Sequence, residues 1–253
     1  MEDFEITMCL EVQGISKDYG DQHVLAGITF SLKKGEVLGI IGPNGAGKST
    51  LFNIIAGWLP PTRGEVFLWG QNITGWTPDR RCRAGMARTF QVPQVFPEMS
   101  ILENVMLGAW FGQGSTLSES QARETSRVAL EMVGLTDKED AAARQLTLMQ
   151  RRLLELARAL AAGPKLLLLD ELAAGLSLKA VRHLTDLILQ LRDQGLTLLL
   201  TDHLLNLVVP VSDRLLALDQ GKIIASGPPQ SLIHDPQVEN AYLGTQDAAG
   251  EEG

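Results

Sequence analysis

The 253-residue chain is long enough for a large core, either as one α/β domain or as a core with an inserted subdomain. Its formal net charge of −8 argues against a general affinity for nucleic-acid backbones, which requires clustered Lys and Arg. Its two cysteines are widely separated in the sequence, which fits a reducing, cytoplasmic compartment. Its apolar stretches are too short for a membrane span, so another subunit must supply any membrane attachment.

The first third of the chain is predicted to form short strands separated by clusters of Gly, Asp and Lys. These strands cover residues 8–12, 27–32, 37–41 and 65–68. The third strand leads directly into the motif G-x-x-x-x-G-K-[ST], and a helical pattern follows over residues 51–56. The motif residues are Gly42, Pro43, Asn44, Gly45, Ala46, Gly47, Lys48, Ser49 and Thr50.

A strand, a glycine-rich turn and a helix in this order predict a site that holds a nucleoside triphosphate. Glycines allow the backbone to wrap around the phosphate oxygens, and the following helix adds the positive end of its dipole. We expect Lys48 to reach the β- and γ-phosphates and Ser49 to ligate Mg²⁺. A chance match to the four fixed positions has a probability of roughly one in a hundred for a chain of this length.

A helical insertion is predicted after the fourth strand. A short strand over residues 87–90 precedes Gln91, and apolar residues then recur at helical spacing between residues 101 and 160. The amide of Gln91 can serve both a metal ion and a water molecule, so this residue could report triphosphate occupancy to the insertion.

Strand signals return in the last third of the chain. Two apolar runs, residues 166–169 and 196–200, predict buried parallel strands joined by a crossover helix over residues 178–191. Because ligands gather at the carboxyl edge of such a sheet, the polar residues that follow these runs are expected beside the phosphate motif. A tail begins at residue 227, and its last residues, 246–253, are polar and expected to be unstructured.

Several side chains at this edge are candidates for the chemistry of phosphate cleavage. Asp170 would hold Mg²⁺ through water, and Glu171 could accept a proton from the attacking water or orient it. On their own, four leucines followed by two acidic residues indicate either an active-site strand or a strand that reaches the surface, at about even odds. The phosphate motif earlier in the chain favours the active-site interpretation. His203 stands where a γ-phosphate contact is needed, although a lone His is more often structural. Away from this edge, Tyr19 either stacks on adenine or packs in the first hairpin, with stacking favoured at about 60:40.

The order of these features resembles the ABC transporter ATPase family over essentially the whole chain. Residues 60–66 and 212–227 also resemble segments of that family. A narrower resemblance, to the G-type ATPase subunit of branched-chain amino acid importers, rests on four segments. They are RTFQ at 88–91, FPEMSILENV at 96–105, AAGL at 173–176 and AYLG at 241–244.

The resemblance implies an α/β fold with a P-loop NTPase (RecA-like) core, an antiparallel β subdomain and an inserted α-helical subdomain. It treats residues 1–253 as a single ABC ATPase domain. Within it, residues 1–90 and 161–226 form the nucleotide-binding core with the β subdomain. Residues 91–160 form the helical subdomain with the family signature, and residues 227–253 form a short C-terminal helical tail.

The resemblance also implies an ATPase that uses ATP and Mg²⁺ to power transport. Tyr19 then stacks on adenine, and Gln91 senses the metal and the membrane subunit. Glu171 is the catalytic carboxylate and His203 the γ-phosphate switch. The implied metal ligands are Ser49, Gln91 and Asp170. The implied partners are a second ABC ATPase subunit, membrane permease subunits and, indirectly, a solute-binding protein. No nucleic acid is expected among the partners. The chain is expected to be a peripheral protein at the cytoplasmic face of the cell membrane.

The family signature, Leu-Ser-Gly-Gly-Gln, caps the γ-phosphate of the ATP bound by the opposite subunit. The corresponding residues here are Leu146, Thr147, Leu148, Met149 and Gln150. Because bulky side chains replace both glycines, we favour a heterodimer in which this chain's own ATP site is active and the partner's site is weakened. The alternative is that Thr147 and the helix N-terminus suffice and both sites work, in a homodimer or a heterodimer.

Two other functions stay open. A soluble ABC-type ATPase acting on ribosomes or DNA usually has two cassettes or a long coiled-coil insertion, and this chain shows neither. A nucleotide-binding subunit with impaired hydrolysis would explain the altered signature, but the chain retains Glu171 and His203. The transported molecule also stays open among branched-chain amino acids, other amino acids, urea and short amides.

Overall fold

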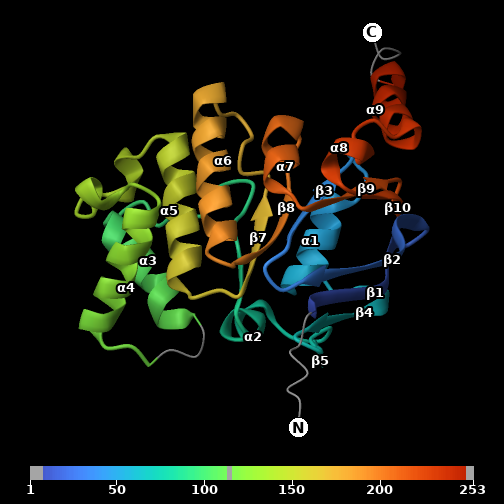
Figure 1. Cartoon of the computed structure of the whole chain (residues 1–253). Coiled ribbons are helices and arrows are strands. Elements are labelled where there is room, and N and C mark those ends of the chain that lie inside the picture. Colours follow the sequence, from blue (N-terminus) through green and yellow to red (C-terminus); the bar gives the residue numbers. More distant parts are fainter. Residues whose placement is uncertain (1–7, 113–115, 249–253) are drawn as a thin grey trace.

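The computed structural model describes residues 8–112 and 116–248. Figure 1 shows two β-sheets on one side of the molecule and a group of three helices on the other. These helices are α3 (Ile101–Phe111), α4 (Glu119–Met132) and α5 (Leu148–Ala161). In the part of the chain that the structure describes, no helix combines the length and the apolar character needed to cross a membrane.

The larger sheet has six strands in the order β10-β9-β3-β8-β7-β6. All neighbouring pairs are parallel except β9 and β10. The strands are β3 (Val37–Ile41), β6 (Met86–Arg88), β7 (Leu166–Asp170), β8 (Thr197–Thr201), β9 (Arg214–Asp219) and β10 (Lys222–Gly227). The carboxyl ends of β3, β6, β7 and β8 therefore lie side by side at one edge of the sheet.

The central strands are buried on both faces. Every residue of β3, β7 and β8 is buried. Along β7, Leu167 and Leu169 pack in the core beneath α5 and α6 (Leu178–Asp193), whereas Leu166 and Leu168 pack in the core that contains α1 (Lys48–Ala56). A strand with two buried faces reads as a continuous apolar run, which is why the leucine runs predicted these strands.

The smaller sheet is antiparallel, with the order β2-β1-β4-β5. Its strands are β1 (Met8–Tyr19), β2 (Gln22–Lys33), β4 (Arg63–Leu68) and β5 (Gln71–Asn72). The predicted strands 8–12 and 27–32 are parts of this longer hairpin, whose far end is largely exposed. An exposed strand end has no buried face and therefore no apolar alternation that could have predicted it.

Short helices and 3₁₀ turns, together with the 13-residue α9, complete the described part of the fold. They are α2 (Pro78–Arg83), the 3₁₀ turns η1 (Thr136–Lys138) and η2 (Ala143–Gln145), α7 (Leu205–Val211), α8 (Pro229–Leu232) and α9 (Pro236–Ala248). The expectation of an unstructured end is wrong for residues 246–248, which belong to α9. These three residues include no Gly or Pro, so nothing in them ends the helix. Residues 249–253 lie outside the described part of the chain.

A buried arginine fixes the far end of α1. Arg81 is 2% exposed, and its Nη1 donates to the carbonyl oxygens of Ile54 and Ile55 in the last turn of α1. Its Nη2 donates to the carbonyl oxygens of Ile73 and Thr74. Burial lowers the pKa of Arg81 to about 10. The guanidinium satisfies carbonyl groups that a helix end leaves unpaired, so α1 is held firmly against the β subdomain.

Candidate active site

The loop between β3 and α1 has a backbone that excludes side chains at two positions. Gly42 has a φ of 153°, and a Cβ there would lie 2.0 Å from the carbonyl oxygen of Leu218. Gly47 has a φ of 103°, and a Cβ there would lie 2.7 Å from Cδ2 of Leu25. Only glycine fits at both positions, so the main chain itself forms the inner surface of the loop.

Helix α1 begins differently from α3, α4, α5 and α6. Helices α3, α4, α5 and α6 each follow a Ser or Thr whose side chain accepts a backbone N–H of the first turn. Helix α1 instead follows Gly47 and has no side-chain cap. The N–H groups of Lys48, Ser49 and Thr50 therefore have no partner within the helix. A helix start of this kind binds anions, so the loop and α1 fit the phosphates of a nucleotide.

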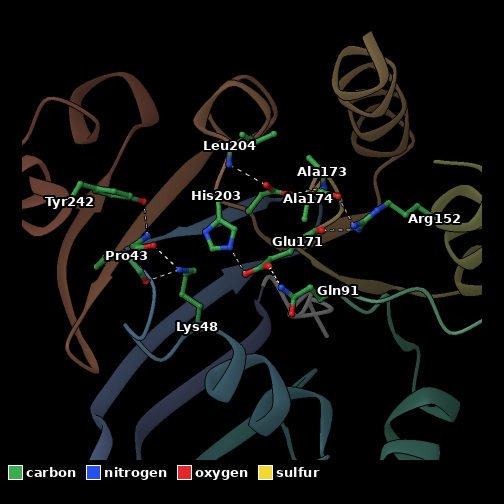
Figure 2. Close-up of polar contacts among 12 residues, drawn as sticks. Pro43, Lys48, Gln91, Arg152, Glu171, Ala173, Ala174, His203, Leu204 and Tyr242 are labelled. Atoms are coloured by element: carbon green, nitrogen blue, oxygen red, sulfur yellow. Dashed lines mark hydrogen bonds and ion pairs between the residues drawn. The ribbon is translucent and has the colours of Figure 1, made fainter. Parts of the chain in front are cut away.

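Lys48 lies over the loop and is almost fully buried, with 6% of its surface exposed. Its Nζ donates to the carbonyl oxygens of Gly42 at 2.6 Å and Pro43 at 2.9 Å, as Figure 2 shows. Burial lowers the pKa of Lys48, and the negative charges of Glu171 and Asp170 oppose this effect. The ammonium of Lys48 therefore interacts electrostatically with both carboxylates that the sequence analysis identified as candidates.

Three of the predicted site residues meet at the carboxylate of Glu171. The Nε2 of His203 lies 2.8 Å from Oε1, and the side-chain amide of Gln91 donates to Oε2 (Figure 2). The three residues follow the carboxyl ends of β8, β7 and β6, which are neighbours in the sheet. Adjacent parallel strands thus bring together groups that lie far apart in the sequence.

The backbone at Glu171 is strained and is held by its surroundings. Its φ is 49°, which a residue with a side chain rarely adopts. Arg152, from α5, donates to the carbonyl oxygens of Glu171 and Ala174, both at 2.8 Å. The carboxylate of Asp202 accepts the N–H of Ala173 at 2.8 Å. Strain maintained by several contacts is typical of functional sites.

Asp170 ends β7 and is 4% exposed. Its Oδ2 accepts from Nη2 of Arg88 at 2.7 Å, and Nη1 of Arg88 donates to Oδ1 of Asn53 in α1, also at 2.7 Å. Mg²⁺ prefers oxygen ligands, so the carboxylate of Asp170, the hydroxyl of Ser49 and the amide oxygen of Gln91 fit this ion by their chemistry. The ion pair between Arg88 and Asp170 was not predicted, because the two residues lie 82 positions apart.

Tyr19 ends β1, and half of its surface is exposed. The Nζ of Lys17 lies 5.0 Å from the centroid of its ring and donates to the carbonyl oxygen of Pro60 at 2.9 Å. A ring packed inside the hairpin would be buried, whereas this ring leaves area for a base to stack on. Stacking of adenine on Tyr19 stays a prediction.

The altered signature forms the start of α5. The Oγ1 of Thr147 accepts the N–H of Gln150, and the side chain of Gln150 accepts the N–H of Thr147 in return. Leu148 is 45% exposed, and its Cδ2 lies 3.7 Å from the position of a Cβ on Gly175. Met149 packs against the core. The start of α5 is therefore capped by its own side chains, unlike the start of α1.

Two further side chains, those of Tyr242 and Glu155, make hydrogen bonds beside the site that the sequence did not predict. The hydroxyl of Tyr242, in α9, accepts the N–H of Gly42 at 2.9 Å (Figure 2). Glu155, in α5, accepts the N–H groups of Phe90 at 3.2 Å and Gln94 at 3.0 Å. The segments that contain Phe90 and Tyr242 resembled the importer subfamily. No local pattern indicated that Tyr242 would contact Gly42 or that Glu155 would contact the backbone of Phe90.

The glycine-rich loop, the uncapped start of α1 and the buried lysine beside two carboxylates define a P-loop protein that binds a nucleoside triphosphate. A family model described as "ABC transporter" matches residues 25–174. The chain is 35% identical over 248 residues to the high-affinity branched-chain amino acid transport ATP-binding protein LivG of Escherichia coli (strain K12), covering 93% of this chain and 97% of that protein. It is also 35% identical over 237 residues to the lipopolysaccharide export system ATP-binding protein LptB of Acidithiobacillus ferridurans, covering 94% and 97%.

Comparison with a solved structure supports the same family. The ADP conformation of MJ1267, an ATP-binding cassette of an ABC transporter, is similar with a TM-score of 0.86 and 33% identity, covering 94% of this chain and 99% of that one. The chain therefore belongs to the ABC transporter ATP-binding protein family. It is an ABC transporter ATPase, and its fold is the predicted P-loop core with an antiparallel β subdomain and a helical subdomain. The predictions of family, fold class and enzyme class are confirmed.

Replacement of the carboxylate of Glu171 tests its role. Glu171→Gln is expected to retain MgATP binding and to lower the rate of ATP hydrolysis by about 100-fold or more, because an amide cannot accept a proton from water. Binding is measured by isothermal titration calorimetry and hydrolysis by phosphate release. Glu131→Gln, at an exposed position of α4, is the matched control. Undiminished phosphate release from the Glu171→Gln protein contradicts the assigned role.

Proposed function

We propose that this chain is the ATP-hydrolysing subunit of an importer for branched-chain or related amino acids, bound to membrane subunits at the cytoplasmic face of the cell membrane. The contact of Gln91 and His203 with the two carboxylate oxygens of Glu171 supports the hydrolytic role. Similarity to LivG supports amino-acid import. The similarity to LptB is as high, so the transported molecule needs a direct test.

In this proposal the side chains of the site have separate tasks. The N–H groups of the loop and the ammonium of Lys48 bind the phosphates. Glu171 accepts a proton from the attacking water or orients it, while Gln91 and His203 hold its carboxylate in one orientation. His203 also contacts the γ-phosphate. An Mg²⁺ ion would neutralise charge on the phosphates. The residues proposed to hold it are Ser49, Gln91 and Asp170.

The membrane subunits are proposed to dock short helices in a groove between the helical subdomain and the core. The groove has a volume of about 540 Å³. Three of its aromatic side chains, Trp58, Phe96 and Phe111, are 60%, 49% and 73% exposed. Exposed aromatic rings around an apolar groove are typical of a surface that receives a partner helix. Phe90 and Gln94 also line the groove and flank Gln91 in the sequence, so a docked helix would contact the segment that carries the active-site glutamine.

A second cassette is proposed to complete the ATP site of this chain. Three large apolar side chains, Leu148, Leu178 and Leu205, are 45%, 68% and 38% exposed. They stand at the starts of α5, α6 and α7. Exposed leucines at these helix starts support a contact with another subunit beside the nucleotide.

The altered signature favours a heterodimer. In a homodimer, both ATP sites would be completed by a segment with Leu148 and Met149 in place of glycines. Thr147 and Gln150 also cap α5 with their own side chains, which leaves fewer N–H groups for a phosphate. A partner with an unaltered signature would keep the ATP site of this chain fully active.

Uptake by the assembled transporter tests the proposed function. The chain is purified with the membrane subunits that it binds and is reconstituted in vesicles with the solute-binding protein. We expect ATP-dependent entry of labelled leucine, isoleucine or valine, and we expect Glu171→Gln to abolish it. If none of the three enters while urea, a short amide or another amino acid does, the branched-chain assignment is contradicted.

Restoration of the signature glycines tests the asymmetry of the two ATP sites. The double variant Leu148→Gly and Met149→Gly is expected to raise ATP turnover of the assembled transporter, up to double, because the second site becomes active. The control is Leu148→Ala with Met149→Ala, which shortens both side chains without the conformational freedom of glycine. Unchanged turnover in the glycine variant contradicts the asymmetry and supports two working sites.

A further inference from the structure

A series of side-chain contacts leads from the docking groove to the carboxylate of Asp170. At the groove, the ring of Trp58 meets the ring of Phe90 edge-on, with centroids 5.8 Å apart and an interplanar angle of 79°. The Cζ of Arg88 lies 5.1 Å from the ring centroid of Phe90. Arg88 in turn donates to Oδ2 of Asp170 at 2.7 Å. Arg88 thus contacts both one ring of the aromatic pair at the groove, that of Phe90, and the acid proposed to hold the metal.

Arg88 also reaches the helix that starts at the phosphate-binding loop. Its Nη1 donates to Oδ1 of Asn53, within α1, at 2.7 Å. The side chains of Arg88 and Asp170 are 8% and 6% exposed, so their ion pair is shielded from water. The two hydrogen bonds use different nitrogens of one rigid, planar group. A movement of the guanidinium therefore changes the contacts with α1 and β7 together.

The guanidinium has one side that hydrogen bonds do not fix. The Nε of Arg88 is buried and has no hydrogen-bond partner within the described ranges. A buried donor without a partner is costly, and no hydrogen bond holds the guanidinium on that side. The position of Arg88 therefore depends on Asp170, Asn53 and the ring of Phe90.

We propose that Arg88 is a positioning residue that couples the docking groove to Asp170. With MgATP bound, the guanidinium of Arg88 would be repelled by the metal ion beside Asp170 and would shift against Phe90, which would change the surroundings of Trp58. Because coupling is reciprocal, a membrane helix that contacts Trp58 and Phe90 in turn fixes the orientation of the Asp170 carboxylate. The second effect rests on the proposed docking of membrane subunits, whereas the first concerns this chain alone.

Tryptophan fluorescence of the full chain tests this coupling. Trp58 is 60% exposed, so its emission can respond to small changes around it. Saturating MgATP is expected to change the emission, and Trp58→Phe is expected to remove that change, which identifies its source among the four tryptophans. ATP with excess EDTA is expected to give a smaller change at equal occupancy, because no metal ion then lies beside Asp170. Occupancy is measured by isothermal titration calorimetry.

Two variants interrupt the contacts at different points. Arg88→Gln removes the charge and the two-nitrogen contact, and we expect it to lose more than half of the Trp58 signal per bound MgATP. Phe90→Leu removes the ring between Arg88 and Trp58 but leaves the ion pair in place, and we expect the same loss. The Phe90→Leu variant keeps the test decisive if the Arg88→Gln protein does not fold. The matched control is Arg83→Gln, at an exposed arginine of α2, which is expected to keep the full signal.

The outcomes separate coupling from a merely structural role. An arginine that only stabilises the fold would, when replaced, lower the unfolding temperature and leave the signal per bound nucleotide unchanged. That result overturns the proposal, and so does a native protein whose emission shows no Trp58-dependent change. The measurement needs no membrane subunit and no transported molecule, so its failure is distinct from a failure of amino-acid import.

Discussion

The main-chain N–H groups at the start of α1 provide the interaction on which the other parts of the site depend. The loop before them excludes side chains at Gly42 and Gly47, and no side chain caps the helix. Strand β3, buried on both faces, fixes one end of the loop, while Arg81 fixes the far end of α1. The core therefore sets the position of the phosphate site. The ammonium of Lys48 then lies over the loop, within the influence of the carboxylates at the ends of the neighbouring strands.

Buried charge is the second constraint on this edge of the sheet. Asp170, Glu171 and Glu155 are 4%, 5% and 1% exposed, and each carboxylate is bonded to specific donors. Burial raises the pKa of Glu155, and the hydrogen bonds from two backbone N–H groups oppose this effect. Helix α5 supplies both Glu155, which holds the loop after β6, and Arg152, which holds the backbone of Glu171. A shift of the helical subdomain would therefore displace the loop after β6 and the backbone at Glu171 together.

Local patterns predicted the parts of the structure that depend on local sequence. Strand β3 has its predicted bounds, the leucine runs mark β7 and β8, and the crossover helix is only two residues longer than predicted at its C-terminus. Glu171 and His203 were expected at one sheet edge and Gln91 at the entry to the helical insertion, and the structure brings Gln91 and His203 to the carboxylate of Glu171. The contacts of Arg88 with Asp170 and of Tyr242 with Gly42 could not be predicted, because no local pattern or spacing rule connects residues that lie 82 and 200 positions apart. The exposed end of the long hairpin escaped prediction because it has no buried face.

Binding of MgATP to the Lys48→Ala protein, measured by isothermal titration calorimetry, tests the central claim most directly. The claim is that the loop, α1 and the ammonium of Lys48 together bind the phosphates of ATP. Loss of a charged hydrogen-bond donor to the phosphates is expected to weaken the affinity by about tenfold or more and to abolish uptake by the assembled transporter. An unchanged affinity together with unchanged uptake would contradict the claim, and the roles assigned to the surrounding carboxylates would then lose their basis.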